Sequence, residues 1–454
     1  MPIKVMNIHL ENFKSFSDVT LNLENKKLTE AKKLVCIYGE NGSGKTNIIH
    51  SMSFLIETLQ TRSFSKFIQD KLPELQKEGK IPKAFINDLM KNNLSMDISN
   101  LCKNYHYIDN DNLMKLKYDF LFMEKPCEYT LVIGDDVKYE KLSYKINTKV
   151  SEVFAISDES LKFSPSIFKN KKYNNSLKEK IKQYWGKHTF LSIITAEFSD
   201  KNESYIEENF DSSFIRFIKE LSQISVVTKQ NNGEAHIMAS AIPLEVNQPS
   251  GIIHKEQKSL LVSYQKLLNF FFTSVYADID EIYYKFEERS KNQLKFTLYA
   301  QKRMNGELKN IPFDIESSGT KKLLQYFMYL LNCLNGQTVF VDEMDDGIHD
   351  LLFAKIIDGL RDVMQGQLVI TTHNTTLLEY LNPKEVYVIQ KDFKANTIIE
   401  CINNYQQRTQ KTNSIRSKYL RGDYEGIPYV DAFDAEILQG QFLKFRDAVV
   451  KQHA

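Results

Sequence analysis

Residues 39–46 read Gly39-Glu40-Asn41-Gly42-Ser43-Gly44-Lys45-Thr46, which matches the phosphate-loop pattern G-x-x-x-x-G-K-[ST] in full. A continuous apolar run at 34–38 precedes this loop, as in a strand buried on both faces, and apolar residues at helical spacing follow it. Glycines allow backbone N–H groups to close around phosphate oxygens, and the start of the helix adds partial positive charge. The loop therefore predicts ATP binding, with Lys45 on the β- and γ-phosphates and Thr46 on Mg²⁺.

A second apolar strand, at 339–341, ends in the carboxylates Asp342 and Glu343. Alone, such a strand is as often structural as functional, but downstream of a phosphate loop it is the Walker B pattern. We expect Asp342 to hold the magnesium shell through water. Hydrolysis needs a group that polarises the attacking water beside the γ-phosphate, and we assign that role to Glu343.

A third strand, at 367–371, is followed by His373. A lone histidine at the end of a strand is usually structural. Its position after the strand that ends in Asp-Glu favours a catalytic role, in which His373 hydrogen-bonds the γ-phosphate and senses hydrolysis.

Residues 316–320, the signature segment, read Glu316-Ser317-Ser318-Gly319-Thr320 and open an expected helix at 320–334. They resemble the L-S-G-G-Q signature of ABC proteins, which caps the γ-phosphate held by the other head of a pair. The first, third and fifth positions depart from that pattern. Ser317, Ser318 and Gly319 are the candidates for this role, and the alternative is a serine that only caps its own helix.

The remaining pattern predicts an α/β protein. Two stretches near the N-terminus alternate apolar and polar residues as half-buried strands do, 115–147 indicates antiparallel strands, and 155–280 is mostly helical. Within that helical region, residues 229–234 indicate a surface loop. Farther along the chain, Asn305-Gly306 indicates a hairpin. Further strands are expected at 338–341, 367–371 and 385–390.

Composition sets wide limits on function. Lys plus Arg number 59 and Asp plus Glu 58, so the net charge of +1 creates no general attraction to nucleic acid or membrane. None of the five cysteines lies in a C-x-x-C pair, which argues against a zinc site or a disulfide framework. Neither a signal peptide nor an uninterrupted membrane span is visible, so we expect a cytoplasmic protein.

Together these motifs resemble the ABC-ATPase superfamily that includes SMC proteins, RecF and the OLD-family nucleases. The opening Leu10-Glu11-Asn12-Phe13-Lys14-Ser15-Phe16 looks like the start of those heads, which implies that Lys14 and Ser15 lie near the nucleotide base and sugar. The resemblance implies mixed parallel and antiparallel sheets flanked by helices. It implies a head at 1–60 and 290–405, to which the antiparallel strands at 115–147 are expected to belong. A mainly helical insertion is expected at 150–290 and a C-terminal element at 406–454.

The likeness is closer to compact OLD-like "AAA family ATPases" of bacterial anti-phage defence, including PARIS and abortive-infection systems. It rests on 316–322, on 342–352 and on the tail at 416–428. The stretch after His373 is too short for the Toprim domain of an OLD nuclease, so the resemblance implies a separate effector, a nuclease or toxin.

Three functions remain in competition. The first is a regulatory ATPase that dimerises through its ATP-bound heads and controls the effector. The second is a RecF-like DNA-repair ATPase that grips DNA, which the neutral net charge disfavours. The third is a metabolic ATP hydrolase. The first two share one active site, so the motifs alone do not separate them.

Overall fold

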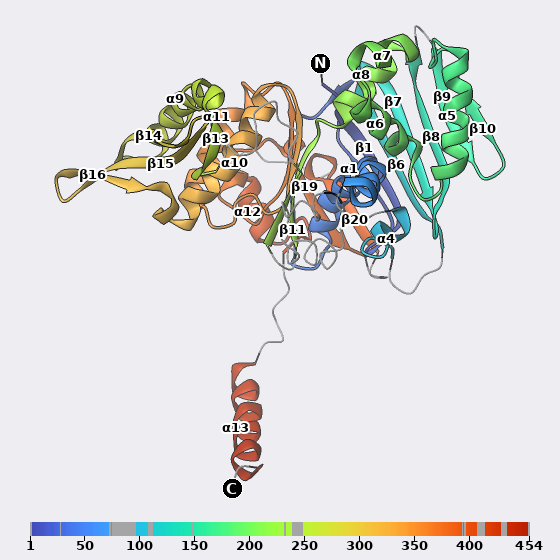
Figure 1. Ribbon diagram of the computed structural model, residues 1–454. Coiled ribbons are helices and arrows are strands. Elements are labelled where there is room, and N and C mark those ends of the chain that lie inside the picture. The colour runs from blue at the N-terminus through green and yellow to red at the C-terminus, as the bar shows by residue number, and fades with distance from the viewer. Residues whose placement is uncertain are drawn as a thin grey trace.

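The computed structural model describes residues 2–27, 29–71, 74, 97–107, 112–146, 149–230, 233–237, 248–392, 394, 396–405, 414–427 and 434–452. Within them the chain forms two large sheets, a smaller third sheet and flanking helices (Figure 1). This mixed α/β architecture confirms the predicted fold class. No helix in the described part of the chain is both long and apolar enough to cross a membrane.

The first large sheet is antiparallel. Its strand order is β10 (Leu161–Phe163), β9 (Lys149–Ser157), β8 (Val137–Ile146), β7 (Lys125–Ile133), β6 (Met114–Phe122), β1 (Lys4–Phe13) and β2 (Phe16–Asn22). The expected antiparallel strands at 115–147 therefore exist and pair directly with the N-terminal hairpin. The short strands β3 (Glu24–Lys26) and β4 (Glu30–Ala31) form a separate ribbon.

The second large sheet carries the phosphate loop. Its order is β12 (Gly233–Ile237), β11 (Ser225–Gln230), β17 (Thr338–Val341), β18 (Gln367–Thr371), β5 (Leu34–Gly39), β19 (Val386–Lys391) and β20 (Thr397–Cys401). The five strands from β11 to β19 are parallel, and β12 and β20 are antiparallel edges.

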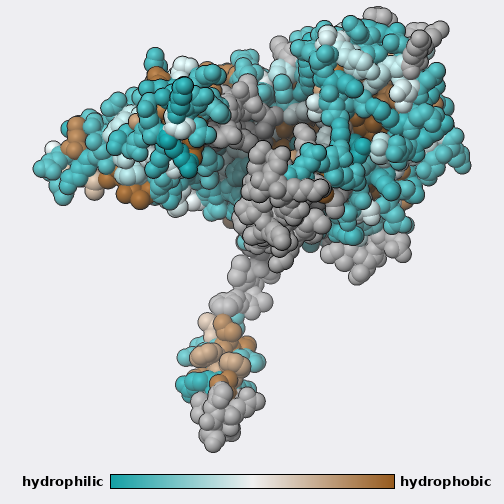
Figure 2. Space-filling view, viewed as in Figure 1, coloured by the Kyte–Doolittle hydropathy of each residue, from teal (hydrophilic) through white to brown (hydrophobic). Residues whose placement is uncertain are grey.

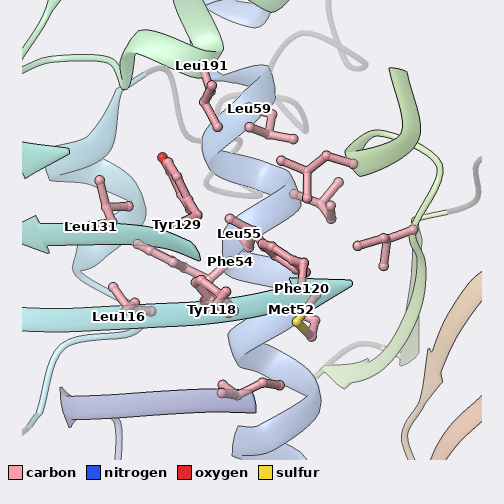
Figure 3. Packing of buried hydrophobic residues seen from close by; sticks show 14 of the residues in the cluster. Met52, Phe54, Leu55, Leu59, Leu116, Tyr118, Phe120, Tyr129, Leu131 and Leu191 are labelled. Atoms are coloured by element: carbon pink, nitrogen blue, oxygen red, sulfur yellow. The ribbon is translucent and has the colours of Figure 1, made fainter. Parts of the chain in front are cut away.

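Strand β5 is buried along its whole length because both of its faces are covered. Val35 and Ile37 belong to the apolar core that includes α1 (Lys45–Lys66), whereas Cys36 and Tyr38 belong to the core on the opposite face. Helix α1 lies between the two large sheets. Figure 3 shows its side chains, among them Met52 and Leu55, packed against β6 and β7.

The stretch 150–290 contains more strand than the sequence predicts. Helices α5 (Lys171–Tyr184), α6 (Phe190–Asp200), α7 (Glu203–Asn209) and α8 (Ser212–Leu221) lie with the antiparallel sheet (Figure 1). Strands precede and follow them, and β11 joins the sheet of the phosphate loop. The sequence pattern could not separate the two, because a short apolar run fits a buried strand and a buried helix segment equally well. How these parts divide into domains remains a prediction.

The third sheet is smaller than the other two. Strands β13 (Ser250–His254), β15 (Gln293–Met304), β14 (Ile279–Ser290) and β16 (Glu307–Pro312) form it. The hairpin at Asn305-Gly306 is confirmed, with positive φ at both residues. The helices of this half of the chain are α9 (Lys258–Val275), α10 (Ser318–Leu334) and α11 (Asp350–Arg361).

Three further helices complete the described chain. They are α4 (Ile98–Cys102), α12 (Ile415–Leu420) and α13 (Ala435–Gln452). Helix α13 lies apart from the other elements in Figure 1, and Figure 2 shows apolar residues on its surface. Phe442 and Phe445 are among its exposed side chains.

Candidate functional site

The candidate residues gather at one edge of the second sheet. The phosphate loop follows β5, Asp342 and Glu343 follow β17, and His373 comes soon after β18. These three strands are parallel neighbours, so their carboxyl ends meet at the same edge. Ligands of open parallel sheets bind at that edge, which makes it the candidate nucleotide site.

The phosphate loop is tightly packed against the N-terminal hairpin. Gly44 has φ 108°, and a Cβ atom there would lie 2.6 Å from the ring of Phe16, so no larger residue fits without displacing β2. The Lys45 ammonium donates hydrogen bonds to the carbonyls of Gly39 and Glu40, at 2.8 Å each. Burial lowers the pKa of Lys45, although the nearby carboxylates of Glu343 and others oppose this shift.

Asp342 lies at the bottom of the site and is fully buried. Its Oδ1 accepts a hydrogen bond from the hydroxyl of Thr371 at 2.6 Å. Burial raises the pKa of Asp342, and the nearby side chains of Thr371 and Thr46 oppose the rise. Its second oxygen, Oδ2, has no partner among the described residues.

This arrangement fits a hard cation. A buried carboxylate oxygen without a donor lies on a side chain that has the side chain of Thr46 nearby. Carboxylate and hydroxyl oxygens, completed by water and phosphate, are the ligands that Mg²⁺ prefers. Ser43 in the phosphate loop likewise has a buried hydroxyl without a partner. Metal binding by Thr46 and Asp342 remains a prediction that this geometry supports.

Glu343 is held in a strained backbone conformation. Its φ of 43° lies in the left-handed region, which is rare for a residue with a side chain and is concentrated at functional sites. Its N–H donates to the Thr371 hydroxyl at 2.7 Å. One carboxylate oxygen, Oε1, lies 3.9 Å from Nε2 of His373, and the other, Oε2, contacts the ammonium of Lys229.

His373 lies at the open side of the site. Its backbone N–H donates to a carboxylate oxygen of Asp345 at 3.4 Å. Burial lowers the pKa of His373, and the Lys45 ammonium lowers it further, so the imidazole is neutral at pH 7. A neutral ring can donate one hydrogen bond to a phosphate oxygen without carrying a charge.

Lys14 and Ser15 lie beside the first turns of α1. The Ser15 hydroxyl accepts a hydrogen bond from Asn47 at 2.7 Å, next to the phosphate loop. The Lys14 ammonium lies 2.8 Å from Nδ1 of His50. Burial, and then the charge of Lys14, lower the pKa of His50 to about 4, so His50 is a neutral acceptor for Lys14. Contacts of Lys14 and Ser15 with base and sugar remain predictions.

The signature segment begins α10 as expected, at Ser318 rather than Thr320. Ser317 is the N-cap, and its hydroxyl accepts a hydrogen bond from the Thr320 N–H at 3.1 Å. A Cβ atom on Gly319 would lie 2.5 Å from the carbonyl oxygen of Gly347, so this glycine is required for close packing on the loop after β17. No hydrogen bond joins the segment to the phosphate loop among the described residues.

Comparison with known proteins agrees with this site. Residues 195–379 match the family described as "AAA domain, putative AbiEii toxin, Type IV TA system". An "ATP/GTP phosphatase" of Helicobacter pylori is 21% identical, over 89% of this chain and 93% of that protein. The "Retron Vc95 probable ATPase" of Vibrio cholerae is 20% identical, over 86% of this chain and 74% of that protein.

Over most of its length the chain is thus similar to proteins named as an ATPase or an ATP/GTP phosphatase. A solved SMC head bound to the C-terminal winged-helix domain of ScpA is 14% identical, with a TM-score of 0.42, over 87% of this chain and 96% of that one. The region that matches the family model, 195–379, includes Asp342, Glu343 and His373.

Sequence reasoning missed one residue of the ATPase head, Lys229. The polar run at 229–234 predicts a surface loop, but Lys229 lies inside β11, beside β17. The signal that could have found it is the β-branched stretch at 224–228, Ile-Ser-Val-Val-Thr, which is a strand pattern followed by Lys229 and Gln230. Gln230 is the last residue of β11, at the same edge of the sheet. The resemblance to ABC heads does not identify which glutamine of this chain corresponds to that of the Q-loop.

Proposed function

We propose that this ATPase is the regulatory chain of an anti-phage defence system of the abortive-infection type, and that ATP-driven pairing of its heads controls a separate effector. The matched family description names a toxin–antitoxin system, and one relative is named as a retron ATPase. Both names support a defence role for this chain. A nuclease or toxin encoded beside it would support the proposal, and a replication operon would favour DNA repair.

The chemistry assigned to one head follows from the geometry of the site. Lys45 and the N–H groups of the phosphate loop bind the phosphates, and the Lys45 ammonium leaves the two backbone carbonyls that it now contacts. Thr46 and Asp342 would hold Mg²⁺, which would neutralise charge on the phosphates. Glu343 orients the attacking water, and His373 donates a hydrogen bond to the γ-phosphate.

One observation supports pairing of two heads. The phosphate loop, Asp342, Glu343 and His373 lie at one edge of the second sheet, whereas the start of α10 makes no hydrogen bond to the phosphate loop among the described residues. The N-terminus of α10 is a ready donor for an anion. The γ-phosphate needs donors on its far face, and the Ser317–Gly319 stretch of a second copy would supply them. ATP then stabilises the pair of heads. Hydrolysis weakens it, because the contacts that only the paired state makes are contacts to the γ-phosphate, which hydrolysis removes.

We expect Ser317→Arg to preserve ATP binding by a single head but to block pairing and hydrolysis. The long cationic side chain occupies the surface that would face the partner's phosphates. ATP affinity is measured by calorimetry, and the mass of the assembly by light scattering with ATP and Mg²⁺. Ser317→Thr, which keeps a capping hydroxyl, is the matched control and is expected to pair.

Mixing Ser317→Arg with Lys45→Ala tests the shared site directly. In a two-fold pair of these chains, one site combines an intact phosphate loop with an intact signature segment. We expect part of the ATPase activity to return on mixing, although each variant alone is inactive. Full activity of Ser317→Arg as a strict monomer would rule out a site completed by two chains.

A further inference from the structure

Lys229 is the centre of a network of charged side chains that joins the site to the signature helix. Its ammonium contacts Glu343 Oε2 and lies 2.8 Å from a carboxylate oxygen of Asp346. That same oxygen of Asp346 lies 3.2 Å from the ammonium of Lys322, on the second turn of α10. Lys322 also pairs with Glu234 at 3.0 Å. The network therefore links β11, the Walker B carboxylate and α10.

The carboxylates around Lys229 hold its side chain in place and keep it charged. Burial lowers the pKa of Lys229, but the carboxylates of Asp346 and Glu343 outweigh this effect and raise it. The side chain is therefore a permanent cation, and about a third of it is exposed.

We propose that Lys229 is a positioning residue for ATP hydrolysis, which holds the Glu343 carboxylate by one oxygen and couples it through Asp346 and Lys322 to the signature helix. This inference rests on the role of Glu343 in the proposed function. Lys229 binds Oε2, which leaves Oε1, on the side of His373, to accept a proton or hydrogen bond from water.

Electrostatic repulsion explains why such a cation is needed. Glu343 follows Asp342 directly, so two carboxylates lie side by side, and the charge of Glu343 helps to raise the pKa of Asp342. Without a cation nearby, Glu343 would turn away from this repulsion toward solvent, since about a third of its side chain is exposed. Lys229 offsets the repulsion and restricts the carboxylate to one orientation. Holding a catalytic group in one orientation raises the rate of the chemical step but changes the affinity for substrate little.

The coupling to α10 gives the network a second consequence. Lys322 and Lys229 share one oxygen of Asp346, in the loop that also packs on Gly319. When the γ-phosphate held by a partner head binds at the start of α10, the helix shifts and Lys322 moves with it. Asp346 follows, because it is paired with Lys322. Lys229 transmits that shift to Glu343. Head pairing and orientation of the base are thereby one coupled event.

The test compares Lys229→Met with Lys229→Arg in the full-length protein. For Lys229→Met we expect kcat to fall roughly 10- to 100-fold, because a small misplacement of a catalytic group has an effect of that order. The dissociation constant for ATP, measured by calorimetry, should change by less than about twofold. Arg keeps the charge and both carboxylate contacts, so Lys229→Arg should restore most of kcat. Melting temperatures of both variants report whether the fold is intact.

Two controls make the outcomes distinguishable. Lys255→Met removes the ion pair between Lys255 and Glu288, whose charged atoms lie 2.7 Å apart at the third sheet. This variant should leave turnover unchanged. Glu343→Gln, assayed in parallel, tests the proposed function itself: wild-type turnover in that variant contradicts the role of Glu343. If Glu343→Gln is inactive but Lys229→Met retains full kcat, only the inference about Lys229 is wrong. A large loss of ATP affinity in Lys229→Met would overturn it too, since Lys229 would then bind phosphate directly.

Discussion

Glu343→Gln is expected to slow ATP hydrolysis by about 10²- to 10⁴-fold, the usual contribution of a positioned general base. The amide has almost the shape of the carboxylate, and the backbone hydrogen bond of residue 343 to Thr371 does not depend on the side chain. ATP should therefore remain bound while its hydrolysis is blocked. The paired heads should accumulate, because loss of the γ-phosphate contacts is what separates them.

Two measurements check this expectation. Steady-state phosphate release gives the loss of turnover, and light scattering with ATP and Mg²⁺ gives the mass of the assembly, which should exceed that of wild type. Glu307→Gln, at an exposed position in the β15–β16 hairpin, is the matched control. Wild-type turnover in Glu343→Gln would show that another group orients the water. A slow variant that stays monomeric with ATP would contradict the pairing.

Lys45→Ala is expected to weaken ATP binding by more than about 100-fold, because a charge-assisted contact to phosphate contributes roughly 3 kcal/mol. The fold should survive the change. Alanine is the strongest helix former at the start of α1, and the contact of Lys45 with the Glu40 carbonyl is only partly buried, so water can replace it there.

Calorimetric titration with ATP measures the affinity, and thermal unfolding without nucleotide checks the fold. Lys66→Ala, at the other end of the same helix, is a matched control that removes only a surface pair with Asp200. The control should bind ATP as wild type does. Unchanged affinity in Lys45→Ala would remove the phosphate loop from the proposed mechanism.

The sequence predicts the parts of the fold whose patterns are local. The continuous apolar run before the phosphate loop is a strand because both of its faces are covered, and Asn305-Gly306 is a hairpin because both residues adopt positive φ. The two strands that bring Asp342, Glu343 and His373 together, β17 and β18, are also recognisable, since each is an apolar run with polar residues after it. The order in which strands pair is not local, and no pattern within β11 identifies β17 as its neighbour.

The same limitation explains what was missed at the site. Lys229 lies in a polar run, and only the parallel pairing of β11 brings its side chain to Glu343. The partner of Lys14 was hidden for a related reason: His50 is one of many polar residues on α1, and it meets Lys14 only once α1 lies between the two sheets. Contacts of this kind depend on tertiary packing rather than on spacing in the chain.

The pairing of β5 has a consequence for how the protein is made. Both neighbours of this strand, β18 and β19, come from the last quarter of the chain, at 367–371 and 386–391. At about 5–20 residues per second, a ribosome needs roughly 20 to 60 seconds to reach them after making β5. For all of that time the apolar strand beside the phosphate loop has no sheet to join. The newborn chain is therefore an expected client for chaperones, and a ribosome that stalls before 367–391 releases a product that cannot assemble the nucleotide site.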